Sequence, residues 1–92
     1  MANIFIQRKH QLPTKELKSK IDSIMVDLQS EVEFQSQWES EQEFSFRRKG
    51  AKGRIEIDDS NFSLNLNLGI MFRALKGQIE KRIIGVVDQY II

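Results

Sequence analysis

Five cations fall within eight residues in the middle of the chain, on both sides of a glycine-bearing turn. They are Arg47, Arg48, Lys49, Lys52 and Arg54. Guanidinium and ammonium groups around a tight turn can converge on a phosphate or another polyanion. The same charges also protect strand ends from edge-to-edge pairing with other chains. Because no aromatic residue is interleaved for base stacking, the pattern does not favour a nucleic-acid partner.

Other residues with reactive side chains do not combine into a catalytic set. His10 is the only histidine, and no triad or metal-site partner can be assigned to it. It therefore indicates a polar cap or packing residue at a strand end. Carboxylates gather near two turns without the spacing of a calcium-binding loop, and they are Glu39, Glu41, Glu43, Asp58 and Asp59. We predict a protein that is not an enzyme and that needs no metal or cofactor.

Composition sets broad limits on the fold and its location. The chain has 92 residues, 40% hydrophobic and 29% charged, which predicts one small globular domain over residues 1–92. Its formal charge of +1 gives no general attraction to nucleic acid or to an anionic membrane. The sequence contains no cysteine, no apolar leader segment and no run long enough to span a membrane. We therefore expect a cytoplasmic protein.

Hydrophobic periodicity predicts the first elements that position these side chains. Ile4 and Ile6 alternate with their neighbours, as in a short first strand. Thr14 follows Pro13 and is predicted to cap the N-terminus of a helix. One apolar stripe at helical spacing is expected along this helix, formed by Leu17, Ile21, Ile24, Met25 and Leu28.

Four segments of alternating polarity follow, separated by short polar turns. They cover residues 32–38, 44–46, 55–57 and 62–68. Such alternation indicates an antiparallel meander whose apolar face must be covered. A long helix is then predicted to the chain end, with a core stripe of Phe72, Leu75, Ile79, Ile83, Val86 and Tyr90. The predicted fold is a two-layer α+β domain in the order β-α-β-β-β-β-α, with a four- to five-stranded antiparallel sheet covered by two helices.

The face of the last helix away from this stripe carries two glycines. A glycine in an exposed helix costs about 1 kcal/mol relative to alanine. Ile91 and Ile92 also fall outside the core stripe. Close packing against a partner would explain these positions, and we expect a homodimer; the alternative is that they are under little structural constraint. The predicted partner face consists of Ala74, Gly77, Lys81, Ile84 and Gly85.

Several segments in a fixed order carry a family resemblance. They are IFIQRKHQLP, the strand around Trp38, GAKGRIEI, and LNLGIMFRALKGQIEKRI. Together they resemble the polyhydroxyalkanoic acid system family, small bacterial proteins named for their association with storage-polyester granule genes. The residues that carry most of the resemblance are His10, Leu12, Leu75, Lys76, Gly77, Ile79, Glu80 and Ile83.

The resemblance implies a place at the surface of the polyester granule or in the regulation of granule genes. It transfers no catalytic residue, cofactor or ligand to this chain. It also implies that Lys76, Gly77 and Glu80 serve something beyond packing. The strand leading into a long helix is similar to part of the helix-grip folds, which hold apolar ligands between a curved sheet and a C-terminal helix.

Three functions from different classes remain open. We favour a non-enzymatic binding protein that meets the polyhydroxyalkanoate granule, or a granule-coat protein, through aliphatic groups outside its core. The basic hairpin would then aid adhesion to anionic components. The alternative is a small carrier of a fatty-acyl or hydroxyacyl ligand held between the sheet and the C-terminal helix, which a pocket lined by Phe and Leu would favour. The third is nucleic-acid binding through the five cations.

Overall fold

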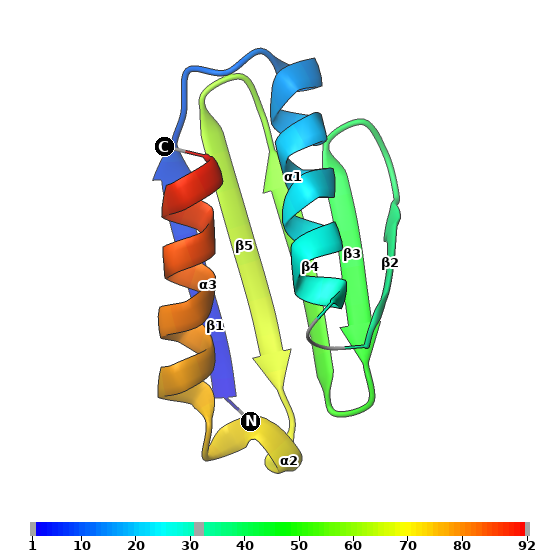
Figure 1. Cartoon of the computed structure of the whole chain (residues 1–92), viewed down its shortest axis with the longest axis vertical. Helices are drawn as coiled ribbons and strands as arrows, with labels where there is room; N and C mark the ends of the chain where they lie inside the picture. Colours follow the sequence, from blue (N-terminus) through cyan, green and yellow to red (C-terminus); the bar gives the residue numbers. More distant parts are fainter. Residues whose placement is uncertain (1, 31–32, 92) are drawn as a thin grey trace.

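The computed structural model describes residues 2–30 and 33–91 (Figure 1). The predicted strand residue Val32 and Ile92, which was expected outside the core stripe, lie outside the described residues. The strands are β1 (Ala2–Lys9), β2 (Gln35–Trp38), β3 (Glu43–Arg48), β4 (Ala51–Ile57) and β5 (Asn61–Leu68), and the helices are α1 (Thr14–Gln29), α2 (Ile70–Arg73) and α3 (Lys76–Tyr90).

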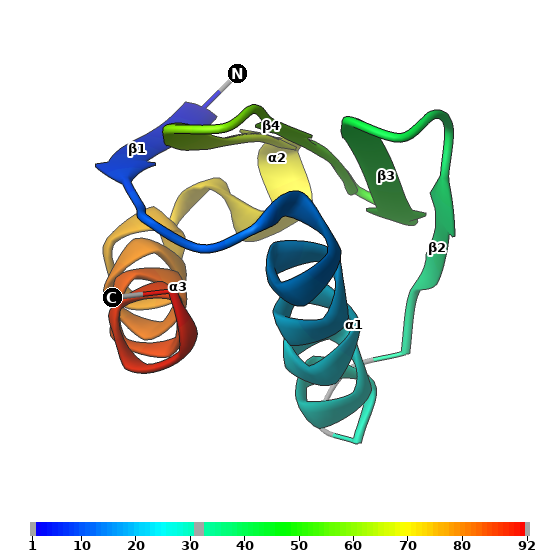
Figure 2. The same ribbon diagram turned by 90° about the horizontal axis from the view of Figure 1, so that it is seen from above.

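The five strands form one antiparallel sheet in the order β1-β5-β4-β3-β2. The consecutive strands β2 to β5 make the predicted meander, and β1 adds to its far edge beside β5. In that pairing Ile4 lies opposite Leu66, so residues far apart in the sequence share one face. Figure 2 shows both long helices on one side of the sheet, and β2 turning toward α1. The predicted two-layer α+β fold is confirmed.

The core lies between the sheet and the two long helices. The predicted stripe of α1 is buried at Leu17, Ile21, Ile24 and Met25, while Leu28 is half-buried. The apolar residues of β1, β4 and β5 occupy every second position, so their side chains point toward these helices. The buried sheet residues are Ile4, Ile6, Phe44, Ile55, Ile57, Phe62, Leu64, Leu66 and Leu68.

The start of α1 differs from the prediction. Pro13 occupies the N-cap position, Thr14 is the first helical residue, and no side chain caps the helix. The carbonyl of Pro13 accepts the N–H of Leu17 at 2.9 Å, so the first intrahelical hydrogen bond begins one residue earlier than expected. The fixed φ of proline suits this position, and it displaces the capping role assigned to Thr14.

The predicted C-terminal helix is divided into two. The chain forms the short α2 after Gly69 and starts α3 at Lys76, with Leu75 at the junction. Leu75, which was predicted in the core stripe, is 44% exposed. Ile91, which was predicted outside it, is 4% exposed and packs in the core. Both errors arise because a helical phase was counted through a break in the helix.

The opposite face of the sheet carries no helix within the described residues (Figure 2). Its side chains are mostly polar, as the alternation predicts, and Asn65 and Asn67 of β5 are exposed there. Phe5 is the apolar exception on this face, at 59% exposure, and it lies opposite Asn65. Among the described residues, no helix combines the length and apolar character needed to cross a membrane.

Candidate functional site

An apolar pocket lies between the sheet and α3, near the end of the molecule that carries α2. Its volume is about 340 Å³. The side chain of Leu28 reaches it from the last turn of α1, and the β3–β4 hairpin closes another side. The residues that give the pocket its apolar wall include Phe34, Phe46, Leu66, Phe72, Ile79 and Ile83. These six residues come from five separate elements or connections, so the sequence pattern did not reveal the pocket.

Arg48 and Phe72 lie together at the rim of this pocket. The Arg48 guanidinium carbon is 5.0 Å from the centroid of the Phe72 ring, a cation–π distance. The Phe72 ring also packs closely on the hairpin at Gly50. A Cβ atom added to Gly50 would lie only 3.1 Å from Cε2 of this ring. Gly50 has φ +89°, which favours glycine, and its carbonyl accepts the N–H of Gly69 at 2.8 Å. These contacts fix α2 against the β3–β4 hairpin.

Phe46, which lines the pocket, packs against Gly53. They are direct partners in the β3–β4 ladder, and the Phe46 ring occupies the space where a Cβ on Gly53 would lie. Phe34 meets the same ring edge-on, with centroids 6.1 Å apart and an interplanar angle of 63°. The glycine therefore allows an aromatic side chain to lie flat across the strand.

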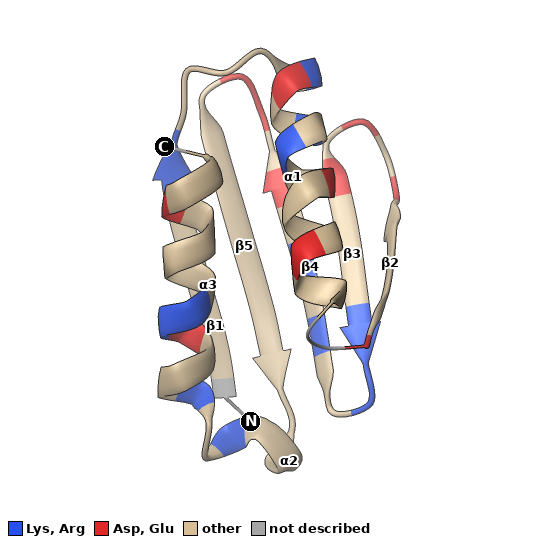
Figure 3. Cartoon of the chain, in the orientation of Figure 1, with Lys and Arg blue, Asp and Glu red and all other residues tan. Residues whose placement is uncertain are grey.

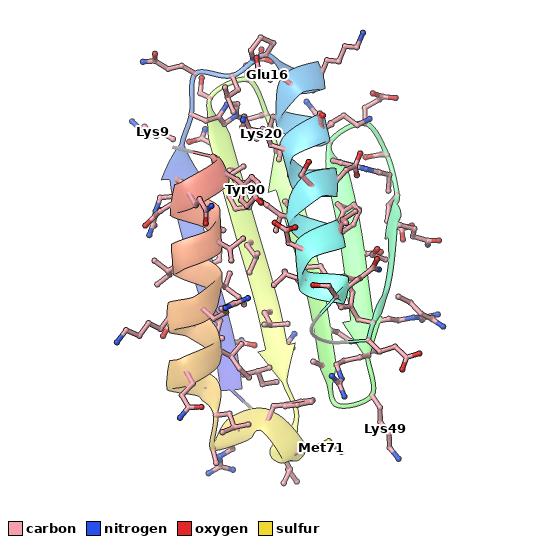
Figure 4. The ribbon with its side chains drawn as sticks, viewed as in Figure 1. Lys9, Glu16, Lys20, Lys49, Met71 and Tyr90 are labelled. Atoms are coloured by element: carbon pink, nitrogen blue, oxygen red, sulfur yellow. The ribbon has the colours of Figure 1, made fainter. Side chains whose placement is uncertain are left out.

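α2 and the junction that follows it present an exposed apolar tip, defined here as Ile70, Met71 and Leu75. Their exposed fractions are 88%, 60% and 44%. Figure 4 shows Met71 and Lys49 projecting at the same end of the molecule. Lys and Arg gather at this end, on the β3–β4 hairpin and around α2, whereas most acidic residues lie toward the other end or on α1 (Figure 3). The tip is therefore an apolar surface with a basic surround.

The five clustered cations do not converge on one point. Alternation places Arg47, Lys52 and Arg54 on the open face of the sheet, whereas Arg48 lies on the pocket side with Phe72. Arg54 forms ion pairs with Glu43 at 3.3 Å and with Glu56 at 3.4 Å. The geometry thus separates the predicted anion patch into two faces and a hairpin tip at Lys49.

His10 is buried and connects two turns. The N–H of Leu12 donates to its Nδ1 at 3.1 Å, so Nε2 carries the proton and donates to the carbonyl of Asp58 at 2.8 Å. The Asp58 carboxylate in turn accepts backbone N–H groups of Ser60 at 2.8 Å and Asn61 at 2.6 Å. These two hydrogen bonds hold the pKa of Asp58 below its usual range.

Glu39 and Glu41 have separate partners. The Ser45 hydroxyl and then the Gln37 amide, each at 2.7 Å, donate to Glu39 and lower its pKa. Glu41 pairs with Lys18 at 3.1 Å. Within residues 2–30 and 33–91, no group of acidic or histidine side chains is arranged to hold a metal ion.

The predicted partner face is only partly exposed. Ala74, Gly77, Lys81 and Gly85 are exposed, and a Cβ on either glycine would meet nothing within 4 Å. Ile84 is half-buried and packs against the core, so it does not belong to an open surface.

The two residues from the family resemblance beside this face, Lys76 and Glu80, are half-buried in the first turns of α3. They lie on the side of the helix between the core stripe and the exposed glycines.

A second, more polar groove runs between α1 and α3, and Lys81 and Gly85 line it. The hydroxyl of Tyr90 spans this groove and donates to the Asp27 carboxylate. Figure 4 shows Tyr90 between the two helices. The hydrogen bond to Asp27, then burial and the negative charge of Asp27, raise the pKa of Tyr90. This contact links the ends of the two long helices.

The structure adds residues that sequence reasoning missed. Ile70 and Met71 were not assigned to a surface, although they stand outside the apolar stripe through Phe72. A helical count that began at Gly69 would have shown them on a different face. No pattern in the sequence indicates the contact of Arg48 with Phe72, because this contact depends on how the β3–β4 hairpin packs against α2.

The geometry defines the class as a small two-layer α+β fold with an apolar pocket between its sheet and its C-terminal helix. A family model described as "Putative polyhydroxyalkanoic acid system protein" matches residues 4–91. The chain therefore belongs to the polyhydroxyalkanoic acid system family, as its sequence resemblance predicted. A search of curated proteins finds no match to this chain.

Proposed function

We propose that this protein is a non-enzymatic, cytoplasmic binding protein that attaches to the polyhydroxyalkanoate granule, at the polymer or through a granule-coat protein. Family membership supports the link to this system. The observation that carries the attachment is the exposed apolar tip of Ile70, Met71 and Leu75. The proposal places the contact at α2 and the junction after it, whereas sequence analysis expected aliphatic groups outside the core without assigning them to α2.

The tip is large enough to give useful affinity. Its exposed fractions, at about 1.5–3 kcal/mol per fully buried aliphatic side chain, correspond to roughly 3–6 kcal/mol on contact with an apolar surface. The ordering cost of association must be subtracted from this. Basic side chains beside the tip, including Lys49 and Arg73, add attraction to anionic components that salt screens. The apolar contribution does not depend on that attraction.

Co-sedimentation with isolated polyhydroxyalkanoate granules tests the proposal at low and at high salt. We expect the wild-type protein to sediment at both, and the double variant Ile70→Ser, Met71→Ser to stay in solution at high salt. Phe5→Ser is the matched control, because it removes an exposed apolar side chain from the opposite face of the sheet. Wild-type protein that stays in solution at both salts, or a tip variant that sediments like wild type, overturns the proposal.

A second candidate is a carrier of a fatty-acyl or hydroxyacyl ligand. The observation that favours it is the apolar pocket between the sheet and α3, whose wall includes Phe34, Phe46 and Phe72. At about 340 Å³ the pocket falls in the range of about 300–1,000 Å³ that small-molecule sites occupy. Binding of an acyl probe to the protein in solution, with no granule present, would support the carrier function.

A further inference from the structure

We propose that the apolar pocket binds the hydrocarbon chain of an acyl carboxylate, with the carboxylate at Arg48 on the rim. The inference rests on the carrier candidate and adds the chemistry and orientation of the ligand. The pocket shares only Leu75 with the apolar tip, since Ile70 and Met71 do not line it.

The interior of the pocket selects for a hydrocarbon. Leu66 and Leu68 of β5 line it from the sheet, and Ile79 and Ile83 line it from α3. The lining residues with polar side chains are Arg48 on the hairpin, Gln78 and Arg82 on α3, and Arg47, whose side chain lies on the open face of the sheet. A polar group placed among the leucines and isoleucines would lose its water without gaining a hydrogen bond, at a cost of several kcal/mol.

The volume of the pocket limits the length of the acyl chain that it can hold. A cavity of about 150 Å³ accommodates benzene, and by proportion about 340 Å³ gives room for on the order of ten non-hydrogen atoms. This matches a medium-length acyl chain. A long-chain fatty acid would extend beyond the pocket onto the surface.

The rim selects the headgroup. Arg48 is exposed, and its guanidinium lies over Phe72 at 5.0 Å, so the planar donor group is already held beside the apolar wall. A guanidinium can donate two parallel hydrogen bonds to a carboxylate. Arg82 also lines the pocket from α3, and the hairpin adds further positive charge at this end (Figure 3). An anionic headgroup is therefore favoured over a neutral or cationic one.

Three probes with the same chain separate these contributions: decanoate, 1-decanol and decylamine. Binding is followed by ¹H–¹⁵N NMR on the full chain, with each probe below its aggregation concentration. We expect all shifts to map to β5 and α3, and decanoate to bind most tightly. Arg48→Gln should weaken decanoate roughly three- to tenfold and leave 1-decanol unchanged. Lys52→Gln is the matched control, because it removes a charge of the same hairpin from the opposite face.

The outcomes distinguish this inference from the carrier candidate. If decanoate and 1-decanol bind equally, or if Arg48→Gln and Lys52→Gln have the same effect, the headgroup assignment is overturned and a carrier remains. If none of the probes binds, both are overturned. Ala51→Leu, which fills the pocket from β4, should block every probe. If Ala51→Leu fails to fold, the variant Arg48→Gln, which changes an exposed residue, still tests the headgroup assignment.

Discussion

The ring of His10 satisfies two backbone groups, one after β1 and one between β4 and β5. Leu12 N–H and the Asp58 carbonyl both depend on it, and the residue is 7% exposed. This explains why a histidine occurs here although it has no catalytic or metal-site partner. Its two ring nitrogens supply one acceptor and one donor at a fixed separation. The position is structural, and the sequence had indicated a polar cap or packing residue.

His10→Phe should destabilise the fold by about 1–3 kcal/mol, because a ring of similar shape would leave one backbone donor and one acceptor unpaired. Equilibrium unfolding in urea measures the change. Gln11→Ala is the control, since Gln11 is an exposed neighbour. An equal effect of the two substitutions would show that the hydrogen bonds of His10 contribute nothing.

Asp58 gives the fold a specific dependence on pH. Its folded-state pKa lies below the ordinary value of 3.8, because the N–H groups of Ser60 and Asn61 donate to the carboxylate. The unfolded state therefore binds the proton first as the pH falls. The stability contributed by Asp58 is complete above about pH 4–5 and is lost as the pH falls through the folded-state pKa. Asp58→Asn should therefore reduce the loss of stability between pH 7 and pH 3.

Urea unfolding at the two pH values tests this prediction. Asp59→Asn changes the same charge at the adjacent exposed position and serves as the control. If the two variants lose as much stability on acidification as the wild type, the turn around Asp58 is not the source.

At the scale of elements, β3 and β4 fit together through Phe46 and Gly53. Gly53→Ala should destabilise by about 1–3 kcal/mol, because the new methyl group would occupy the position of the Phe46 ring. Phe46→Leu in the same chain should recover part of this loss, since a smaller side chain makes room for the methyl group. A double-mutant cycle by thermal unfolding measures the coupling. Additive effects would contradict the predicted contact.

The exposed glycines of α3 offer a test of the homodimer that the sequence led us to expect. Gly77→Ala and Gly85→Ala should each stabilise a monomer by about 0.5–1 kcal/mol, because alanine is the better helix former and a Cβ meets nothing within 4 Å. If a second copy packs on this face, Gly85→Leu should instead dissociate the dimer. Thermal unfolding and sedimentation velocity measure the two effects. An unchanged sedimentation coefficient for Gly85→Leu would exclude this face as the dimer contact.

At the scale of the whole molecule, the apolar tip, the basic hairpin and the pocket rim all lie at one end. Arg48 of the hairpin contacts Phe72 of α2, and Gly50 is hydrogen-bonded to Gly69. The opposite end holds His10, which is hydrogen-bonded to the Asp58 turn and to Leu12 before α1. The molecule thus has the apolar tip, basic hairpin and pocket rim at one end and the hydrogen bonds of His10 at the other.

This division predicts a gradient of local stability. Amides of β4 and β5 should exchange with solvent most slowly, since each strand is paired on both sides. Amides of α2 should exchange fast, because the helix has four residues and none is buried. Hydrogen exchange followed by NMR gives both rates for one sample. Protection of α2 equal to that of β5 would show that the tip is not a locally weak element.

The local elements followed from the sequence because periodicity is a local property. The stripe from Leu17 to Met25, the alternation along β5 and the turn at Gly50 were each specified by neighbouring residues. Family membership followed from the order of short segments in the same way. The break at Leu75 was missed because the apolar spacing continues through it, although the backbone does not.

The sequence by itself therefore determined a meander of strands, two amphipathic helices and a basic hairpin. Only the tertiary structure decided that β1 pairs with β5 and that Arg48 meets Phe72. The physical reason is that these relations join residues that are distant in the chain. These contacts depend on which apolar faces pack against each other. One sequence pattern of apolar and polar residues is compatible with several such packing arrangements.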